Sequence, residues 1–493
     1  MDNSDIFREI LLELNGEHNL SVNAEDITID LDETDPTKSN DEIIIENELD
    51  KHMRTIKEIT SLKKTESIDK YIKLEDNEIP IGISGFENLG NTCYMNAILQ
   101  CLINIQLIKE KLLDINIIKE IYNYVSKELN IDEKHNYSVI ISKYGNTITF
   151  QLFKILNSIW KENTKHIKPI LFKKIFSNKI VNFKNNDQHD AHEALLCILD
   201  TIHTEIDSKV DIKYNIFSEE YLKLFVQMDE EKLSDIQCCK MESIYPDIWE
   251  LYTLKKTIDC YNKKSYSFII ENFQNMLSST LQCTECNYHS YNFDPNSVLS
   301  IQIPIELFVN LADINEQISH IQNIPNEMIN QIRTQLINRH SRESIISLEQ
   351  CLTKFFNVEF LDNDEKWHCP NCDKKIKAAK KMDIWLPAHT MIIHLKRFDH
   401  NGNKINNVIT FPINDFNINP YMAEYSKKLG TYNYNLIGVV NHIGSMNGGH
   451  YFSYVKSITD NNWYCINDDD VIKITESDII SENAYILFYQ IHS

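Results

Sequence analysis

Residues 88–100, Asn-Leu-Gly-Asn-Thr-Cys-Tyr-Met-Asn-Ala-Ile-Leu-Gln, join a polar turn to a helical apolar pattern and place Cys93 at the junction. Asn91 and Thr92 belong to the residue types that cap helix starts, so the pattern predicts a helix from Thr92. Unpaired N–H groups and the helix dipole stabilise an anion there, and we expect them to lower the pKa of the Cys93 thiol. The stretch therefore predicts a reactive thiolate, with a buried structural cysteine as the alternative.

The charge balance of the chain argues against nucleic acid as a partner. The 493 residues carry a net charge of −23, and residues 1–50 hold 16 Asp or Glu against two basic residues. Binding to phosphate groups needs a basic surface. The first 30 residues lack the pattern of a secretory signal, and no apolar run reaches the roughly 18 residues that cross a membrane. We therefore expect no membrane partner and an intracellular location, cytoplasmic or nuclear, in a host cell if the chain is viral.

Residues 1–80 are acidic and poor in aromatic residues, which predicts a largely disordered N-terminal tail. An apolar stripe from Ile6 to Leu14 predicts one short amphipathic helix within it. Residues 27–33 and 43–46 resemble SUMO-interacting motifs, in which β-forming residues beside carboxylates add to the edge of another sheet. A solvated tail is the alternative to a SUMO-binding role.

Residues 82–491 have the character of a compact domain. Helical patterns come first and strand patterns later, and this order predicts an α+β fold. Two stretches, about 209–262 and 306–342, have the character of insertions, and the second is predicted to be helical around 326–336. The expected helices begin at Thr92 and span 114–129, 151–160 and 187–206, and the expected strands span 391–398, 435–440, 450–455, 463–466 and 485–489.

A candidate base for the thiol lies late in the chain. His450 follows Gly448 and Gly449 and opens a strand pattern, so a substrate backbone could approach closely just before a rigidly held imidazole. Asn467 and Asp468 come after the next strand pattern and are candidates for the group that orients this imidazole. An ordinary hairpin with a solvated acidic turn is the alternative.

These stretches resemble two conserved boxes of the ubiquitin-specific protease family. The first follows the pattern G-[LFI]-x-N-L-G-N-T-C-[FYW]-M-N-[SA]-x-L-Q from Gly85, and the second follows Y-x-L-x-[AG]-V-[VI]-x-H-x-G, then G-H-Y-x-[AS]-Y and W-x-x-[FI]-[ND]-D. The resemblance implies a catalytic set in which Cys93 is the nucleophile and His450 the general base. Asn467 would orient His450 with Asp468 as a polar assistant, and which of the two matters more stays open.

Substrate-binding residues are implied by the same resemblance. Asn88 would supply an oxyanion donor together with the backbone N–H of Cys93, although it could also simply form the turn. Residues 187–196 resemble the family box Q-[QH]-D-A-x-E-[FL], in which Asp190 reads the Arg-containing tail of ubiquitin. Glu193 would share its helix face, with a solvated acidic face as the alternative. Gly448 and Gly449 would line a channel too narrow for side chains.

Two C-x-x-C knuckles predict a metal site. Four thiolates at this spacing satisfy tetrahedral zinc, so we expect one structural ion and no catalytic cofactor, with separate buried thiols as the alternative. By resemblance the site is the zinc ribbon of a fingers subdomain, here residues 273–303 and 343–386. The ligands are Cys283, Cys286, Cys369 and Cys372.

As a whole, the resemblance implies a papain-like right-hand fold with a helical thumb, a β-rich palm and zinc-bearing fingers. It implies a deubiquitinating thiol isopeptidase that hydrolyses the bond after the C-terminal glycine of ubiquitin on conjugates or precursors. The expected partners are ubiquitin and ubiquitinated proteins. A non-catalytic ubiquitin-binding scaffold and a protease for SUMO or another ubiquitin-like modifier are the alternatives.

Overall fold

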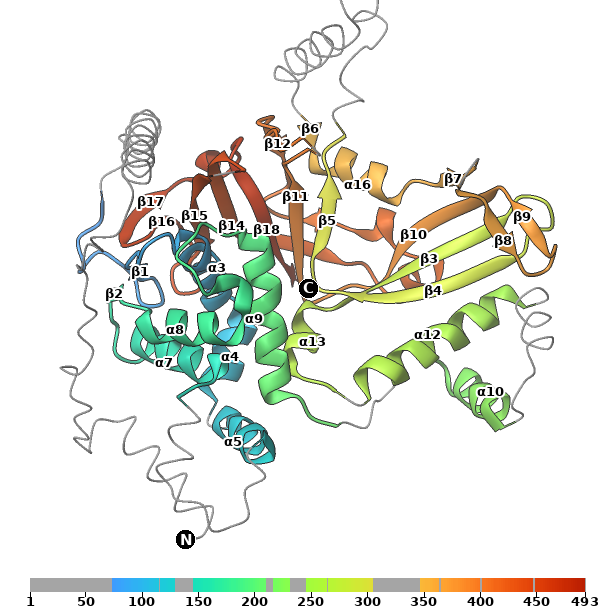
Figure 1. Ribbon diagram of the computed structural model, residues 1–493, viewed down its shortest axis with the longest axis horizontal. Helices are drawn as coiled ribbons and strands as arrows, with labels where there is room; N and C mark the ends of the chain where they lie inside the picture. Colours follow the sequence, from blue (N-terminus) through green and yellow to red (C-terminus); the bar gives the residue numbers. More distant parts are fainter. Residues whose placement is uncertain are drawn as a thin grey trace, which may run out of the picture. The chain divides into compact units, whose positions relative to one another are not determined.

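The computed structural model describes residues 73–114, 116–128, 145–209, 216–230, 245–263, 265–304, 346–362, 365–399, 401–446 and 448–492. The chain divides into two compact units, residues 1–73 with 125–146 and residues 74–124 with 147–493. The predicted tail helix, the two motifs that resemble SUMO-interacting motifs and the predicted helix around 326–336 lie outside the described residues. The elements that carry the candidate site belong to the second unit. Figure 1 labels the helices and strands of the described residues.

Helices form the first part of this unit, which we call the thumb. Helix α3 (Cys93–Ile103) is buried at all 11 positions, including the polar Asn96 and Gln100, whose amides are hydrogen-bonded. It packs against helix α9 (Ala191–Ile206) and against three strands of the large sheet. The other thumb helices are α4 (Gln106–Leu113), α7 (Ile148–Trp160) and α8 (Ile170–Lys179), followed by a 3-10 turn, η2 (Val181–Phe183). Helix α5 (Asn116–Glu128) contains the boundary between the two units at residues 124 and 125.

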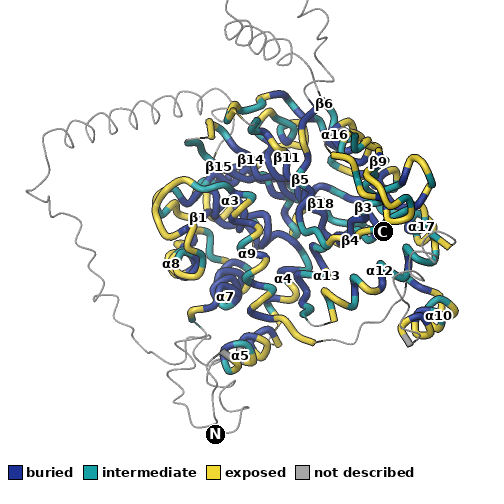
Figure 2. The backbone as a smooth tube through the Cα atoms, turned by 45° about the vertical axis from the view of Figure 1, so that its right-hand side comes forward, coloured by how far each residue is buried: buried dark blue, intermediate teal, exposed yellow. Residues whose placement is uncertain are grey.

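An eight-stranded sheet, here called the palm, receives helix α3. Its order is β17-β16-β15-β14-β18-β11-β5, with β13 also paired to β14. The β11 and β5 strands are parallel and the other neighbours antiparallel, and the central strands are buried (Figure 2). The bounds are β5 (Leu299–Gln302), β11 (Thr390–Lys396), β13 (Phe416–Asn417), β14 (Asn433–Ser445), β15 (Gly448–Lys456), β16 (Trp463–Asn467), β17 (Asp470–Ile474) and β18 (Ala484–His492).

Glycine at one palm position lets the thumb approach closely. A Cβ atom added to Gly438 on β14 would lie 3.1 Å from the Cys101 sulfur of α3, tighter than an ordinary contact. A larger residue there would require the Cys101 side chain or the helix to shift by a few tenths of an ångström. Glycine at position 438 therefore allows close packing of α3 on the middle of the palm.

A four-stranded antiparallel sheet with the order β4-β3-β10-β7 forms the third part, here called the fingers. Helices α10 (Glu219–Glu230) and α12 (Pro246–Asn262), both from the first predicted insertion, pack on it around the buried Trp385. The strands are β3 (Asn275–Cys283), β4 (His289–Asn296), β7 (Glu359–Leu361) and β10 (Ala378–Leu386), and a short hairpin is made by β8 (Trp367–Cys369) and β9 (Lys374–Ile376).

The remaining elements connect these parts. The structure confirms the expected helices and strands within one to four residues at most ends, because each had a clear apolar period. In the described residues no helix is both long and apolar enough to cross a membrane. The connecting elements are β1 (Gly85–Phe86), β2 (His166–Ile167), α13 (Phe268–Phe273), β6 (Ile346–Ser347), α16 (Leu348–Phe356), β12 (Ile409–Thr410), η5 (Asn419–Tyr421), α17 (Glu424–Lys427) and η6 (Glu476–Asp478).

Candidate functional site

Cys93 is the first residue of α3, where the sequence places it, and a tight turn fixes its position. Gly90 and Asn91 both have positive φ, 96° and 50°, which glycine and asparagine tolerate. The side-chain oxygen of Asn88 accepts hydrogen bonds from the N–H groups of Gly90 (3.0 Å) and Thr92 (3.2 Å). Asn88 therefore has the turn-forming role that was one of its two expected roles.

The electrostatic environment of Cys93 differs from the expectation of a lowered pKa. Burial raises the pKa of this thiol to about 11, and the negative charge of Asp468 adds to the effect. The backbone N–H groups of Tyr451 and Tyr94 act in the opposite direction but are outweighed. The expectation was wrong because the helix start is itself buried, and desolvation of the thiolate exceeds the stabilisation by helix N–H groups.

His450 lies on β15 and contacts Asn467 at the end of β16. The Nε2 atom of His450 is 2.5 Å from Oδ1 of Asn467 and 4.0 Å from Oδ2 of Asp468. An amide oxygen can only accept, so Nε2 carries the proton and Nδ1 has the free lone pair. The geometry brings Asn467, rather than Asp468, to the imidazole.

Asp468 instead joins the palm to the turn before Cys93. Its Oδ2 accepts a hydrogen bond from the Asn88 amide (3.0 Å) and its Oδ1 accepts one from the Asn96 amide (3.0 Å). The backbone also pairs here, since Phe86 N–H donates to the Asp468 carbonyl (2.7 Å). The Asp468 carboxylate therefore fixes the orientation of the amide that was expected to stabilise an oxyanion.

Asp190 and Glu193 lie at the start of α9, as the box predicts, but their contacts differ. Oδ1 of Asp190 caps α9 by accepting from the His192 N–H (2.6 Å), and its Oδ2 accepts from the Tyr485 hydroxyl of the palm (2.5 Å). Oε1 of Glu193 accepts from the Asn182 amide (3.0 Å) on an exposed surface. Asp190 thus faces the palm, whereas Glu193 does not face the same side.

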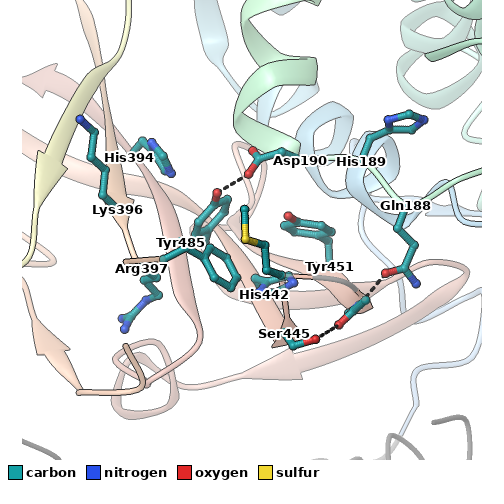
Figure 3. Close-up of a pocket in the computed structure, with 14 residues that line it drawn as sticks. Gln188, His189, Asp190, His394, Lys396, Arg397, His442, Ser445, Tyr451 and Tyr485 are labelled. Atoms are coloured by element: carbon teal, nitrogen blue, oxygen red, sulfur yellow. Dashed lines mark hydrogen bonds between the residues drawn. The ribbon is translucent and has the colours of Figure 1, made fainter. Parts of the chain in front are cut away.

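A cavity of about 350 Å³ lies between the start of α9 and the palm (Figure 3). Gln188, Asp190, Gly448, Gly449 and Tyr485 are among its lining residues, and Glu193 is not. Burial lowers the pKa of two other lining residues, His394 and His442, to about 3, so these imidazoles are neutral at physiological pH. The charged residues of the lining are Asp190 at one wall and Lys396 and Arg397 of the palm.

The surrounding structure requires glycine at only one of the two positions before His450. A Cβ at Gly449 would lie 2.3 Å from Nε2 of His442 and 2.5 Å from the Ile443 carbonyl, so internal packing alone requires glycine there. A Cβ at Gly448 would meet only Oε1 of Gln188, at 3.6 Å. The glycine requirement at position 449 therefore comes from the β14–β15 hairpin itself.

Sequence reasoning missed two residues of this site. The Gly449 N–H donates to Oε1 of Gln188 (2.5 Å), and Tyr485 bonds Asp190 across the cavity. Gln188 stood inside the quoted box, and Tyr485 is the first aromatic residue of a predicted strand. Spacing gave no signal for either contact, because each joins segments more than 250 residues apart.

The four cysteines of the two knuckles converge at the tip of the fingers. Their sulfur atoms all lie within 4.8 Å of one another, with Cys283 and Cys372 3.8 Å apart and Cys286 and Cys369 3.7 Å apart. Tyr288 and Trp367 stack beside them with ring centroids 6.1 Å apart. The cluster could hold a structural metal ion, and it excludes the alternative of separate buried thiols.

Comparison with known proteins identifies the family. A family model described as "Ubiquitin carboxyl-terminal hydrolase" matches residues 84–489. The chain is 28% identical over 456 residues to the probable ubiquitin carboxyl-terminal hydrolase R319 of Acanthamoeba polyphaga mimivirus, covering 83% of this chain and 90% of that protein. It is 27% identical over 412 residues to the ubiquitin carboxyl-terminal hydrolase Usp2 of Drosophila melanogaster, covering 83% of this chain but 35% of that protein. The chain therefore spans only about a third of this cellular relative.

Solved structures agree in fold. The SAGA DUB module of Ubp8, Sgf11, Sus1 and Sgf73 bound to monoubiquitin matches with a TM-score of 0.53 at 21% identity, covering 92% of this chain and 76% of the other. The module bound to ubiquitin aldehyde gives a TM-score of 0.51 at 22% identity, covering 84% and 70%. At such identity the likeness shows the fold alone, and it confirms the expected α+β arrangement. Since the family model spans more than four fifths of the sequence, the chain belongs to the ubiquitin carboxyl-terminal hydrolase family, the cysteine-type deubiquitinating hydrolases.

Proposed function

We propose that this chain is a thiol isopeptidase that hydrolyses the bond after the C-terminal glycine of ubiquitin on conjugates or precursors, with Cys93 as its nucleophile. One observation carries the proposal. Asn467 contacts the His450 imidazole at 2.5 Å. Tyr451, which follows His450 on β15, directs its N–H at the Cys93 thiol. The Cys93 thiol of α3 thus meets the backbone of the β15 residue that follows His450.

In the proposed reaction, Nδ1 of His450 takes the thiol proton while the sulfur attacks the carbonyl carbon of the terminal glycine. Since burial raises the pKa of Cys93 to about 11, the thiol is protonated beforehand, and this transfer accompanies the attack. The Cys93 N–H and the Asn88 amide stabilise the oxyanion. His450 returns the proton to the leaving amine as the C–N bond breaks. Water, deprotonated by His450, then cleaves the thioester and releases the carboxylate and the thiol.

The ubiquitin tail would lie in the cavity between α9 and the palm. Asp190 lines this cavity, and its carboxylate has lone pairs beyond those used by His192 and Tyr485, which supports a contact with the basic tail. Gly448 and Gly449 line it as well. Glu193 points to Asn182, so we assign it a role in positioning α9 rather than in binding the tail.

One structural zinc ion completes the proposal. Ligands on a tetrahedral zinc with bonds of about 2.3 Å lie about 3.8 Å apart. The separations of 3.7 and 3.8 Å within the four-cysteine cluster support zinc held by Cys283, Cys286, Cys369 and Cys372. Four thiolates fill the coordination sphere, so the ion would stabilise the fingers and activate no water. These reduced thiols favour the cytoplasm or nucleus as the compartment.

Labelling with a ubiquitin-based electrophile tests the proposal. We expect ubiquitin with a C-terminal electrophile to form a covalent adduct with the wild-type chain and none with Cys93→Ala. Cys197→Ala, which removes a half-buried thiol of α9, is the matched control and should be labelled normally. An unlabelled wild-type chain, or equal labelling of Cys93→Ala, contradicts the proposal. Faster labelling by a SUMO-based probe would keep the thiol chemistry and overturn the choice of modifier.

A further inference from the structure

The first part of strand β15 is paired with another strand on one side only. Residues 448–452 pair with β14 on one side, from Ser445 opposite Gly448 to Asn441 opposite Phe452. On the other side, pairing with β16 begins only at Ser453. The backbone groups of residues 448–452 on that second side therefore face α9 and α3 of the thumb instead of a strand. A strand edge of this kind is a template for an extended peptide.

Two backbone N–H groups on this edge already interact with groups of other segments. The Gly449 N–H donates to Oε1 of Gln188, and the Tyr451 N–H acts on the Cys93 thiol. Residues 449 and 451 are two apart, so their N–H groups point the same way, about 6.7 Å apart along the strand. If the scissile carbonyl lies at Cys93, the Gly449 N–H lies about two residues away. It therefore faces the carbonyl of the residue two positions before the terminal glycine.

The Gln188 side chain can rotate away from the Gly449 N–H while the surrounding segment stays in place. Its side chain is exposed, whereas the segment around it is anchored. The neighbouring His189 ring packs against Phe183 (4.7 Å between centroids) and Tyr94 (5.4 Å), and Asp190 caps α9. Rotation of the Gln188 side chain would expose the Gly449 N–H and leave α9 in place.

We propose that Gln188 is a placeholder for the substrate backbone. Its amide oxygen occupies the Gly449 N–H in the free enzyme, and a carbonyl of the ubiquitin tail replaces it on binding. The inference rests on the proposed function, since it needs a tail that reaches Cys93. Gln188 is thus a positioning residue that competes with the substrate, and its loss strengthens binding.

Competition by one neutral hydrogen bond predicts a moderate effect. Such a bond contributes about 0.5–1.5 kcal/mol, which corresponds to a roughly two- to twelvefold change in affinity. Gln188→Ala should therefore lower KM for a ubiquitin-fluorophore amide by about two- to twelvefold. The value of kcat should stay within twofold, because the displaced bond is already broken in the bound state. A merely structural role would not separate KM from kcat in this direction.

Binding measurements make the test independent of catalysis. In a Cys93→Ala background, Gln188→Ala should lower the Kd for ubiquitin by the same factor, measured by calorimetry. Ubiquitin that lacks its last four residues cannot reach Gly449, so its Kd should not respond. Gln188→Leu keeps the size of the side chain and removes the acceptor, and it should act in the same direction as Gln188→Ala. A thermal melt of each variant checks that the fold is kept.

The outcomes separate the two proposals. If the wild-type chain cleaves ubiquitin conjugates but Gln188→Ala leaves Kd unchanged or raises it, the placeholder is overturned and the proposed function stands. An equal change with tailless ubiquitin also overturns it. If the chain cleaves no ubiquitin conjugate, yet Gln188→Ala tightens the binding of intact ubiquitin only, the placeholder stands and the proposed reaction fails.

Discussion

The side-chain amide of Asn88 donates a 3.0 Å hydrogen bond to Asp468, 380 positions later in the chain. The same carboxylate accepts a second bond from Asn96, three residues into the α3 helix that begins at Cys93. Asp468 has a positive φ of 53°, a conformation that the turn between β16 and β17 imposes on it. The palm thus orients the Asn88 amide near Cys93, the proposed nucleophile, whereas Asn467 contacts His450, the proposed base.

Removal of the Asp468 carboxylate should therefore affect catalysis through Asn88. We expect Asp468→Ala to lower kcat by about 10- to 100-fold, because Asn88, the proposed oxyanion donor, loses the charged acceptor that holds it. The value of KM should change little. Steady-state hydrolysis of a ubiquitin-fluorophore amide measures both. Asp468→Asn keeps one acceptor oxygen and should recover part of the lost activity. Equal activity of Asp468→Ala and wild type would show that Asn88 does not need the Asp468 hydrogen bond.

Loss of Asn467 should be more severe, since this residue contacts His450 directly at 2.5 Å. Asn467→Ala leaves the imidazole free to rotate and to adopt the wrong tautomer, so kcat should fall by about 10²- to 10⁴-fold. Asn467→Asp keeps an acceptor and should remain within about tenfold of wild type. Single-turnover rates with the same substrate give the comparison. A larger loss for Asp468→Ala than for Asn467→Ala would reverse the two roles.

Much of the site could be predicted from sequence because its signals are local. The turn and apolar period around Cys93, the strand at His450 and the cysteine knuckles each need only a short window. The predicted direction of the Cys93 pKa shift was wrong for a reason that was also local: α3 is mostly apolar and buried along its whole length, including its first residue. Desolvation then outweighs the helix dipole.

Contacts between distant segments could not be predicted in the same way. Gln188 and Gly449, or Tyr485 and Asp190, meet only because α9 and the palm pack together, and no periodicity records that packing. The reason for glycine at position 449 also differs from the expected one, since His442 on the neighbouring strand fills the space of a side chain. A motif gives the identity of such residues but not the atoms they face.

The four-cysteine cluster should make the fingers dependent on metal. We expect one zinc ion per chain by elemental analysis, and Cys369→Ser should abolish it and lower the melting temperature. Cys260→Ser, at an exposed thiol outside the cluster, is the matched control and should keep the zinc. A strong chelator should reproduce the effect of Cys369→Ser on the melting temperature. A metal-free chain with unchanged stability and activity would contradict a structural zinc site.

Glu250 of α12 provides a pH-dependent contact in the fingers. Its Oε1 accepts a 2.8 Å hydrogen bond from the indole N–H of the buried Trp385. Burial raises the pKa of Glu250 from 4.5 to about 7, with Asp247 and Asp383 contributing in the same direction. The carboxyl is therefore neutral in the folded state at mildly acidic pH, and ionising it costs free energy.

A substitution at Glu250 tests the sign of this effect. A group with a raised folded pKa contributes stability that is fully present below the unfolded pKa, near 4.5, and is lost as pH rises through about 7. Glu250→Gln keeps an oxygen for Trp385 and cannot ionise. It should match wild type near pH 5 and be more stable by about 1–3 kcal/mol at pH 8. Thermal melts across this range measure the difference, with Glu271→Gln on the exposed side of α13 as control. A stability difference that does not grow between pH 5 and pH 8 would mean that Glu250 is already ionised in the folded chain, and that α12 binds Trp385 through a charged carboxylate.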